Sequence, residues 1–304
     1  MISKNKQANI LLLAVALIWG STFVLVQNAI SFLEPLLFNG VRFFIAFLFL
    51  LLWLLLFHRH LLKELNTSTF AAGVVLGFCL FIGYAFQTIG LLYTSSSKAG
   101  FITGLSVVLV PLFLLLFFKH KLSVNSTIGI AFATAGLYAI TIGSSLSLNV
   151  GDGFVLICAV GFAMQIVLTG TYSSKHSALL LTIVQIFTVS ALSFIGSLSF
   201  EDWSKLNISS FAKSDVLLAL FVTSIFATAL AFVIQTSLQK YTNASTVALI
   251  FATEPVFASA TAYIFAGERL TVSAFIGCFL ILFGMIVTEL PMQKFMPVLK
   301  QKSG

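Results

Sequence analysis

The stretch PLLFNGVRFFIAFLFLLLWLLLF, residues 35–57, decides the fold, because every residue from Phe43 to Phe57 is apolar. A helix crosses the hydrocarbon core of a bilayer with about 20 apolar residues. A membrane β-strand would instead alternate apolar and polar residues over about ten positions. This stretch shows no such alternation, so it predicts a membrane-spanning helix.

The composition extends this conclusion to the whole chain. Of 304 residues, 59% are hydrophobic and only 8% are charged, whereas a soluble domain carries about 25% charged residues. This excludes a soluble globule, a disordered chain and a nucleic-acid-binding domain. We expect an all-α integral membrane protein with ten transmembrane helices. The predicted spans are residues 9–30, 35–57, 70–93, 97–118, 124–143, 152–173, 178–199, 214–240, 243–265 and 271–290.

Basic residues between the spans predict the orientation, because Lys and Arg flanking membrane helices are retained in the cytoplasm. With the first residue inside, eleven Lys and Arg fall on the cytoplasmic side and four on the other. We therefore expect both termini in the cytoplasm, with residues 291–304 as a cytoplasmic tail, and a location in the plasma or inner membrane. The four outer residues are Lys98, Lys205, Lys213 and Arg269.

An internal repeat appears when the chain is aligned with itself. At an offset of 148, Gln87 meets Gln235 and further Gly and Tyr-Thr pairs coincide. The earlier spans align at an offset of 143, where Arg42 meets Gln185. The polar matches in register across several spans indicate a duplication.

The duplication divides the chain into a first repeat, residues 9–143, and a second, residues 152–290. Each repeat holds five spans, so the second copy enters the membrane inverted. Inverted repeats are typical of carriers that work by alternating access with a site near mid-depth. The alternative is a duplication that serves only packing.

Two charged residues lie far from any loop, where an intramembrane charge costs about 2.5 to 3.5 kcal/mol. Glu254 lies near the middle of its span, and Pro255 disfavours helical geometry there. It suits proton coupling or cation binding; the alternative is a structural pair with Arg42 or hydrogen bonds to neighbouring helices. Arg42 suits two-point binding of a carboxylate or phosphate; the alternative is a side chain that reaches the interface.

Further polar and aromatic residues occupy matching depths in the two repeats and are candidates to line one cavity. Each aromatic residue alone has packing or lipid contact as its alternative. The candidate substrate-binding residues are Trp19, Thr22, Arg42, Tyr84, Gln87, Gln165, Gln185 and Gln235, with Glu254 as the coupling residue.

Small residues predict where helices approach closely. Gly73 with Gly77, and Gly100 with Gly104, have the G-x-x-x-G spacing of close helix contacts. We expect them to pack spans three, four, eight and nine together.

Motifs of enzymes are absent from the sequence. There is no P-loop, no H-E-x-x-H, and no histidine-rich or paired-aspartate cluster inside the spans. We therefore expect no enzyme activity, no catalytic residues, no metal and no cofactor. The expected partners are a small-molecule substrate and the lipid bilayer, without nucleic acid.

Several motifs together resemble the EamA family of the drug/metabolite transporter superfamily, from about residue 9 to 290. The resemblance implies a ten-helix exporter of amino acids, metabolites or drugs, with two inverted five-helix repeats around a central cavity. The sequence departs from the pattern at Lys119-His120-Lys121, opposite Gly267-Glu268-Arg269 in the second repeat. The matching segments are Ala14-Val15-Ala16-Leu17-Ile18-Trp19-Gly20-Ser21-Thr22-Phe23, Val41-Arg42-Phe43, Glu254-Pro255-Val256-Phe257, Gly267-Glu268-Arg269-Leu270-Thr271 and the stretch 277–284.

We conclude from the sequence that the chain is a secondary transporter, with export by alternating access and proton coupling as the expected mode. Two other classes remain open: a facilitative channel, and a membrane receptor or scaffold that transports nothing. A dry, fully packed centre would favour the scaffold.

Overall fold

The computed structural model describes residues 4–94, 96–120, 122–141, 149–265 and 271–289, and every regular element within these residues is a helix. The predicted all-α membrane fold is confirmed. The α-helices are α1 (Lys4–Ala29), α2 (Pro35–Phe57), α3 (Thr67–Gly90), α4 (Ser96–Gly104), α5 (Ser106–Phe118), α6 (Val124–Thr141), α7 (Val150–Tyr172), α8 (Ala178–Phe200), α9 (Ser214–Ser224), α10 (Ala231–Leu238), α11 (Ala244–Phe251), α12 (Glu254–Phe265) and α13 (Val272–Glu289). The short elements are the 3₁₀ turns η1 (Arg59–Glu64), η2 (Trp203–Lys205), η3 (Ile208–Ala212) and η5 (Gln239–Tyr241), and the π turn η4 (Ile225–Leu230).

Among the described residues, eight helical segments are long and apolar enough to cross a membrane, compared with the ten predicted spans. The other two, Val124–Ala139 and Val272–Thr288, are apolar helices of shorter length. The eight segments are Lys4–Ala29, Pro35–Phe57, Thr67–Gly90, Lys98–Phe118, Val150–Tyr172, Ala178–Phe200, Ser214–Tyr241 and Ala244–Thr261.

Polar caps shift some helix starts from the boundaries that hydropathy predicts. α3 begins at Thr67 because the side chain of Asn66 accepts a hydrogen bond from the backbone N–H of Thr69. α7 begins at Val150 because Asn149 and Asp152 form a reciprocal capping box. Such caps satisfy backbone N–H groups that the first helical turn leaves unpaired.

Three of the predicted spans are irregular near their middle. The fourth is interrupted at Leu105, between α4 and α5, and the ninth at residues 252–253, between α11 and α12. The eighth contains the π turn η4 between α9 and α10. Hydropathy averages over a window, so none of these interruptions was predicted directly from the sequence, although Pro255 marked the ninth span.

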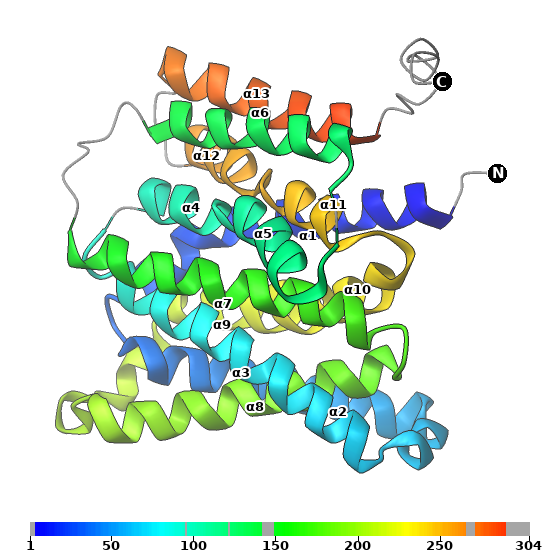
Figure 1. Ribbon diagram of the computed structural model, residues 1–304. Helices are drawn as coiled ribbons and strands as arrows, with labels where there is room; N and C mark the ends of the chain where they lie inside the picture. The colour runs from blue at the N-terminus through cyan, green and yellow to red at the C-terminus, as the bar shows by residue number, and fades with distance from the viewer. Residues whose placement is uncertain (1–3, 95, 121, 142–148, 266–270, 290–304) are drawn as a thin grey trace, which may run out of the picture.

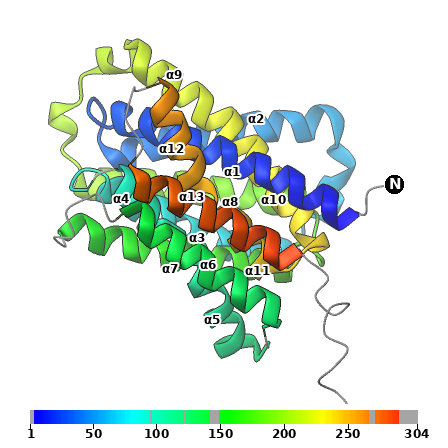
Figure 2. The same ribbon diagram turned by 90° about the horizontal axis from the view of Figure 1, so that it is seen from above.

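The long helices run in roughly one direction across Figure 1, and the start of α1 and the end of α13 lie at the same end of the molecule. α3 packs against α7 and α8, α2 packs against α8, and α1 packs against α9 to α12. α6 and α13 pack against each other at one side of the bundle, as both views show (Figures 1 and 2).

The G-x-x-x-G prediction is correct for one glycine pair and wrong for the other. A Cβ on Gly77 would lie 2.6 Å from the carbonyl oxygen of Gln185, so α3 approaches α8 at backbone contact. This partner is the seventh span, which we did not expect. Gly100 has only Pro255 nearby, at 3.9 Å, and Gly104 faces the side chain of Leu137, so neither lies at a backbone-to-backbone contact.

Two predicted features lie outside the described residues: the cytoplasmic tail over 291–304, and the loop segment Gly267-Glu268-Arg269.

Candidate functional site

An open cavity lies inside the bundle. Side chains from both halves of the chain line it, and they come from α1, α2, α3, α4, α5, α7, α10, α11 and α12. The centre is therefore hollow rather than fully packed. The lining residues are Trp19, Thr22, Phe23, Val26, Arg42, Leu80, Tyr84, Gln87, Leu91, Thr103, Gly104, Ser106, Phe162, Gln165, Ile166, Phe232, Gln235, Phe251 and Glu254.

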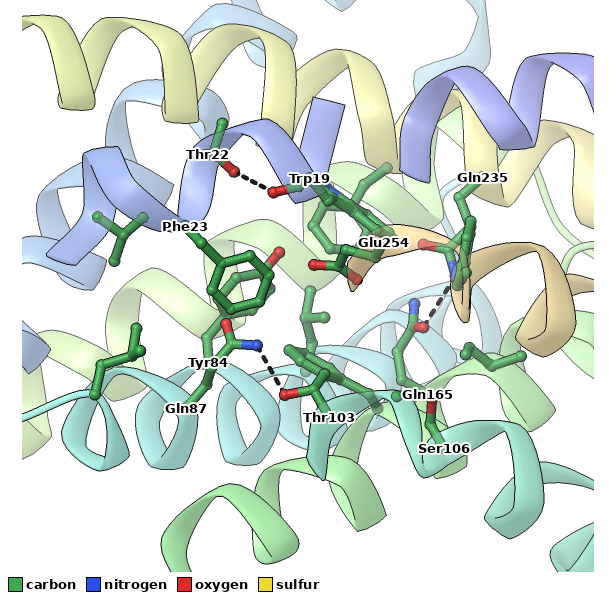
Figure 3. A pocket seen from close by; sticks show the side chains of 18 of the residues that line it. Trp19, Thr22, Phe23, Tyr84, Gln87, Thr103, Ser106, Gln165, Gln235 and Glu254 are labelled. Carbon is green, nitrogen blue, oxygen red and sulfur yellow. Dashed lines mark hydrogen bonds between the residues drawn. The ribbon is translucent and has the colours of Figure 1, made fainter. Parts of the chain in front are cut away.

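Two interrupted helices place polar residues at the cavity wall. Ser106 is the first residue of α5, Glu254 is the first residue of α12, and both line the cavity. Pro255 cannot donate a backbone hydrogen bond, so an α-helix cannot continue unbroken through this point. The carboxylate of Glu254 lies near the centre of the labelled side chains in Figure 3.

A glycine allows α1 to lie directly against the second interruption. A Cβ on Gly20 would be 2.5 Å from the carbonyl oxygen of Glu254 and 2.9 Å from the Cβ of Phe257. No side chain fits between these backbones, which places the neighbouring Trp19 at the cavity wall.

Arg42 is buried, with 3% of its surface exposed. Its Nε donates a hydrogen bond to Oγ1 of Thr228 at 2.9 Å, and its guanidinium carbon lies 4.8 Å from the ring centre of Tyr84. The ring of Phe43 lies 5.3 Å away on the same helix. The side chain therefore stays inside the bundle, and the alternative that it reaches the membrane interface is wrong.

Arg42 and Glu254 line the same cavity but do not pair with each other. An ion pair joins Nζ of Lys98 and Oδ2 of Asp152 at 2.6 Å, and none joins Arg42 to Glu254. The alternative in which Arg42 and Glu254 form a structural salt bridge is therefore not observed. A guanidinium and a carboxyl group therefore face one cavity without bonding each other.

The glutamines form two separate hydrogen-bonded groups (Figure 3). Nε2 of Gln87 donates to Oγ1 of Thr103 at 3.3 Å. On the other side, Nε2 of Gln235 donates to Oε1 of Gln165 at 3.1 Å, and Nε2 of Gln165 donates to Oε1 of Gln185 at 3.5 Å.

Gln185 is a correction to the predicted site. It is fully buried and does not line the cavity. α8 packs against α2 and α3, and the side chain of Gln185 accepts a hydrogen bond from the amide of Gln165. Gln185 therefore supports Gln165 instead of facing a ligand.

Aromatic rings form much of the wall. The indole Nε1 of Trp19 donates to the carbonyl oxygen of Ala227 at 2.7 Å, and its ring lies 4.8 Å from Phe251 and 5.3 Å from Phe232. Oγ1 of Thr22 donates to the carbonyl of Trp19 at 2.8 Å. These contacts hold the rings in place, so this part of the wall is apolar.

Several lining residues were not predicted from the sequence. For some of them the internal repeat gave an indication, because they are equivalent to other lining residues in the opposite half. At the offset of 148, Tyr84 meets Phe232, and Thr103 meets Phe251. All four line the cavity. Thr228, which holds Arg42, had no such signal, because it meets the apolar Leu80.

Known proteins resemble this chain over most of its length. Residues 6–142 and 149–290 each match the EamA-like transporter family. A protein of Archaeoglobus fulgidus named "Uncharacterized transporter" is 36% identical over 287 residues, which are 94% of this chain and 87% of that protein. The Escherichia coli "Uncharacterized inner membrane transporter YedA" is 33% identical over 156 residues, 50% of this chain and 49% of its own. A crystal structure superposes with a TM-score of 0.77 over 96% of this chain and 99% of its own, at 18% identity, and shows a shared fold alone.

Proposed function

Because this chain belongs to the EamA-like transporter family and is a multi-pass membrane transporter, we propose that it exports a small metabolite, amino acid or drug by alternating access, with proton coupling at Glu254. The observation that carries this proposal is a cavity with a buried arginine and a carboxylate that do not pair with each other.

The two charges favour a zwitterion, such as an amino acid, among these substrate classes. A guanidinium binds a carboxylate through two parallel hydrogen bonds. Glu254 offers a carboxylate to the ammonium group of the same ligand. The rings of Trp19, Phe232 and Phe251 favour an apolar body between the two charged ends.

Proton coupling follows from the same carboxylate. A charge inside a membrane protein is costly without a partner. Glu254 has no ion pair or side-chain hydrogen bond within the described residues. We expect it to hold a proton when the ammonium group is absent and to release the proton when the substrate binds.

The cavity lining supports the inverted repeat. Most lining residues form pairs that the two offsets relate, so the two halves contribute equivalent walls. In these pairs the first member comes from the first half and the second member from the other half. The pairs are Trp19 with Phe162, Thr22 with Gln165, Phe23 with Ile166, Tyr84 with Phe232, Gln87 with Gln235, Thr103 with Phe251, and Ser106 with Glu254.

The contact between α6 and α13 supports the same symmetry. Gly129 is equivalent to Gly277, and Gly136 to Gly284, at the offset of 148. A Cβ on Gly129 would meet the carbonyl of Gly284 at 2.7 Å, and a Cβ on Gly136 would meet the carbonyl of Gly277 at 2.5 Å. Such reciprocal contacts are expected of a two-fold axis. We propose that α6 and α13 complete two five-helix repeats. Each of these two helices has 18 residues, a length of about 27 Å at the α-helical rise.

Orientation rests on the ends of the described chain and on charge. The start of α1 and the end of α13 lie at one end of the molecule (Figure 1), together with the turn between α2 and α3 that carries Arg59 and Lys63. We therefore propose that this end lies in the cytoplasm, as the positive-inside rule favours.

The test is transport in proteoliposomes that contain an equimolar mixture of the twenty amino acids, followed by mass spectrometry, with and without a pH gradient. We expect the parent to accumulate at least one amino acid in response to the gradient. Glu254→Gln should exchange substrate without responding to the gradient. Glu64→Gln is the matched control, because Glu64 is exposed in η1, outside the cavity.

Each result bears on a separate part of the proposal. An unchanged response to the gradient in Glu254→Gln would reject coupling at this residue. Absence of amino acid transport by the parent would reject the proposal that the substrate is a zwitterionic amino acid. Flux at electrical rates without saturation would indicate a channel. Export is tested in cells, where overproduction should raise tolerance to a transported amino acid analogue.

A further inference from the structure

The eighth span departs from regular helix where it meets two cavity residues. Six residues, Ile225–Leu230, form a π turn between α9 and α10. The carbonyl of Ala227 in this turn accepts the indole N–H of Trp19, and the hydroxyl of Thr228 accepts the Nε–H of Arg42. Trp19 and Arg42 belong to α1 and α2, so one turn contacts two helices of the other half.

The backbone of the turn explains why the Ala227 carbonyl is available. The N–H of Ala231 bonds to the carbonyls of Phe226 and Thr228 and passes over Ala227. A buried carbonyl needs a partner from elsewhere, and the Trp19 indole supplies it. Ala227 and Thr228 are both fully buried, so water does not replace these contacts. Single π turns inside α-helices are rare and occur often at functional sites.

The other half of the chain supplies an internal comparison. At the offset of 148 the π turn corresponds to residues 77–82, which are regular helix within α3. There Leu80 stands in place of Thr228, and Gln185 stands in place of Arg42. The π turn therefore occurs in the half that faces an arginine and is absent where no arginine needs holding.

We propose that the π turn Ile225–Leu230 is a positioning element of the substrate cavity, in which Thr228 orients the guanidinium of Arg42 and the Ala227 carbonyl orients Trp19. This inference rests on the proposed role of Arg42 as the anion-binding group. Thr228 is a positioning residue, since it does not line the cavity itself.

Thr228 fixes the orientation of the Arg42 guanidinium through one hydrogen bond. Arginine has five N–H donors in a planar fork. The bond from Nε to Thr228 and the ring of Tyr84 against the guanidinium fix the plane of this fork. The remaining Nη donors then present a constant edge to a ligand. Residues that bind a ligand need such support, because a site that is loose by about 1 Å loses much of its affinity.

The test uses a fluorescent reporter and needs no known substrate. Trp53→Phe and Trp203→Phe leave Trp19 as the one tryptophan; neither replaced residue lines the cavity. Quenching of Trp19 fluorescence by iodide, an anion, depends on the positive charge beside the cavity. Quenching by acrylamide, which is neutral, depends only on how accessible Trp19 is. In this background we compare Thr228→Val, which removes the acceptor, with Thr228→Ser, which keeps it.

Thr223→Val is the matched control. Thr223 is a fully buried threonine of α9 whose hydroxyl bonds the carbonyl of Ala219 in its own helix, and it does not line the cavity. We expect Thr228→Val to lower the iodide quenching constant several-fold with acrylamide quenching unchanged. Thr228→Ser and Thr223→Val should match the parent. In transport, Thr228→Val should raise KM about tenfold or more, as expected for a lost hydrogen bond to a charged group, with kcat little changed.

The results separate this inference from the proposed function. If Arg42→Gln lowers iodide quenching while Thr228→Val matches the parent, the positioning role is overturned and the role of Arg42 stands. If Arg42→Gln itself leaves iodide quenching unchanged, the anion-binding role fails. A double-mutant cycle covers the case of poor folding: Thr228→Val should add nothing to Arg42→Gln, and full additivity would contradict the inference.

Discussion

Gly20→Ala tests the packing that places the cavity wall. The added Cβ would lie 2.5 Å from the carbonyl of Glu254, 2.9 Å from the Cβ of Phe257 and 3.0 Å from the backbone nitrogen of Ala258. Ordinary contact begins at 3.4 Å, so α1 and α12 must separate by about 0.9 Å. No side-chain rotation relieves these contacts, because backbone atoms and a Cβ form them. Overpacking of this kind costs about 1–3 kcal/mol, against a gain of up to about 1 kcal/mol in helix propensity.

We therefore expect Gly20→Ala to have a free energy of unfolding about 1–3 kcal/mol lower than a Gly→Ala change at an open helix position, where only the propensity gain applies. The assay is reversible unfolding in mixed micelles, with transport measured in parallel. Gly153→Ala is the matched control, because Gly153 lies in α7 and a Cβ on it would have nothing within 4 Å. The control should be as stable as the parent or slightly more so. Equal stability of Gly20→Ala and Gly153→Ala would refute the close contact between α1 and the Glu254 carbonyl.

Three further substitutions test contacts outside the coupling residue by the same unfolding assay. Asp152→Ala should destabilise by about 1–3 kcal/mol, because it removes the ion pair with Lys98 and the bonds from Thr94 and the Asn149 backbone; a loss under about 0.5 kcal/mol would show that these contacts are unimportant. Gln165→Met should cost about 1–3 kcal/mol, since it breaks the bond from Gln235, and adding Gln235→Met should recover part of the loss. Glu201→Ala should cost about 1–3 kcal/mol, because this carboxylate accepts two backbone N–H groups at the start of α2; Glu201→Gln should lose less, and equal losses would contradict the charge-assisted cap.

Much of the fold was predictable, because a bilayer leaves a backbone few choices. Every N–H and C=O in hydrocarbon needs an internal partner, so long apolar stretches must be helices. Residues 35–57 illustrate this: the predicted span and α2 have the same bounds. The interruptions at Leu105 and residues 252–253 were harder to predict, since they change backbone bonding without changing the average hydropathy.

Some residues of the site could be predicted from the sequence pattern, whereas the place of others depends on how the helices pack. Glu254 and Gln87 were predictable, because polar residues at mid-depth rarely face lipid. Gln185 was not, because its offset from Arg42 gives equal depth but not equal side-chain reach. Arg42 extends far enough to bond Thr228, whereas Gln185 stops at Gln165. Thr228 depended on the π turn, which changes the direction in which each later residue of the helix points.

The differences between equivalent positions carry more information about mechanism than the matches. In the proposed arrangement each half contributes one charge to the cavity: Arg42 stands opposite Gln185, and Glu254 stands opposite Ser106. If the exchange of states moves α12 relative to α2, the distance between Arg42 and Glu254 changes. A ligand that bridges both charges then binds the two states with different affinity, and such a difference is what a ligand needs to shift a conformational equilibrium. A ligand that contacts only one of the two charged groups does not depend on this distance, so it lacks that difference in affinity between the two states.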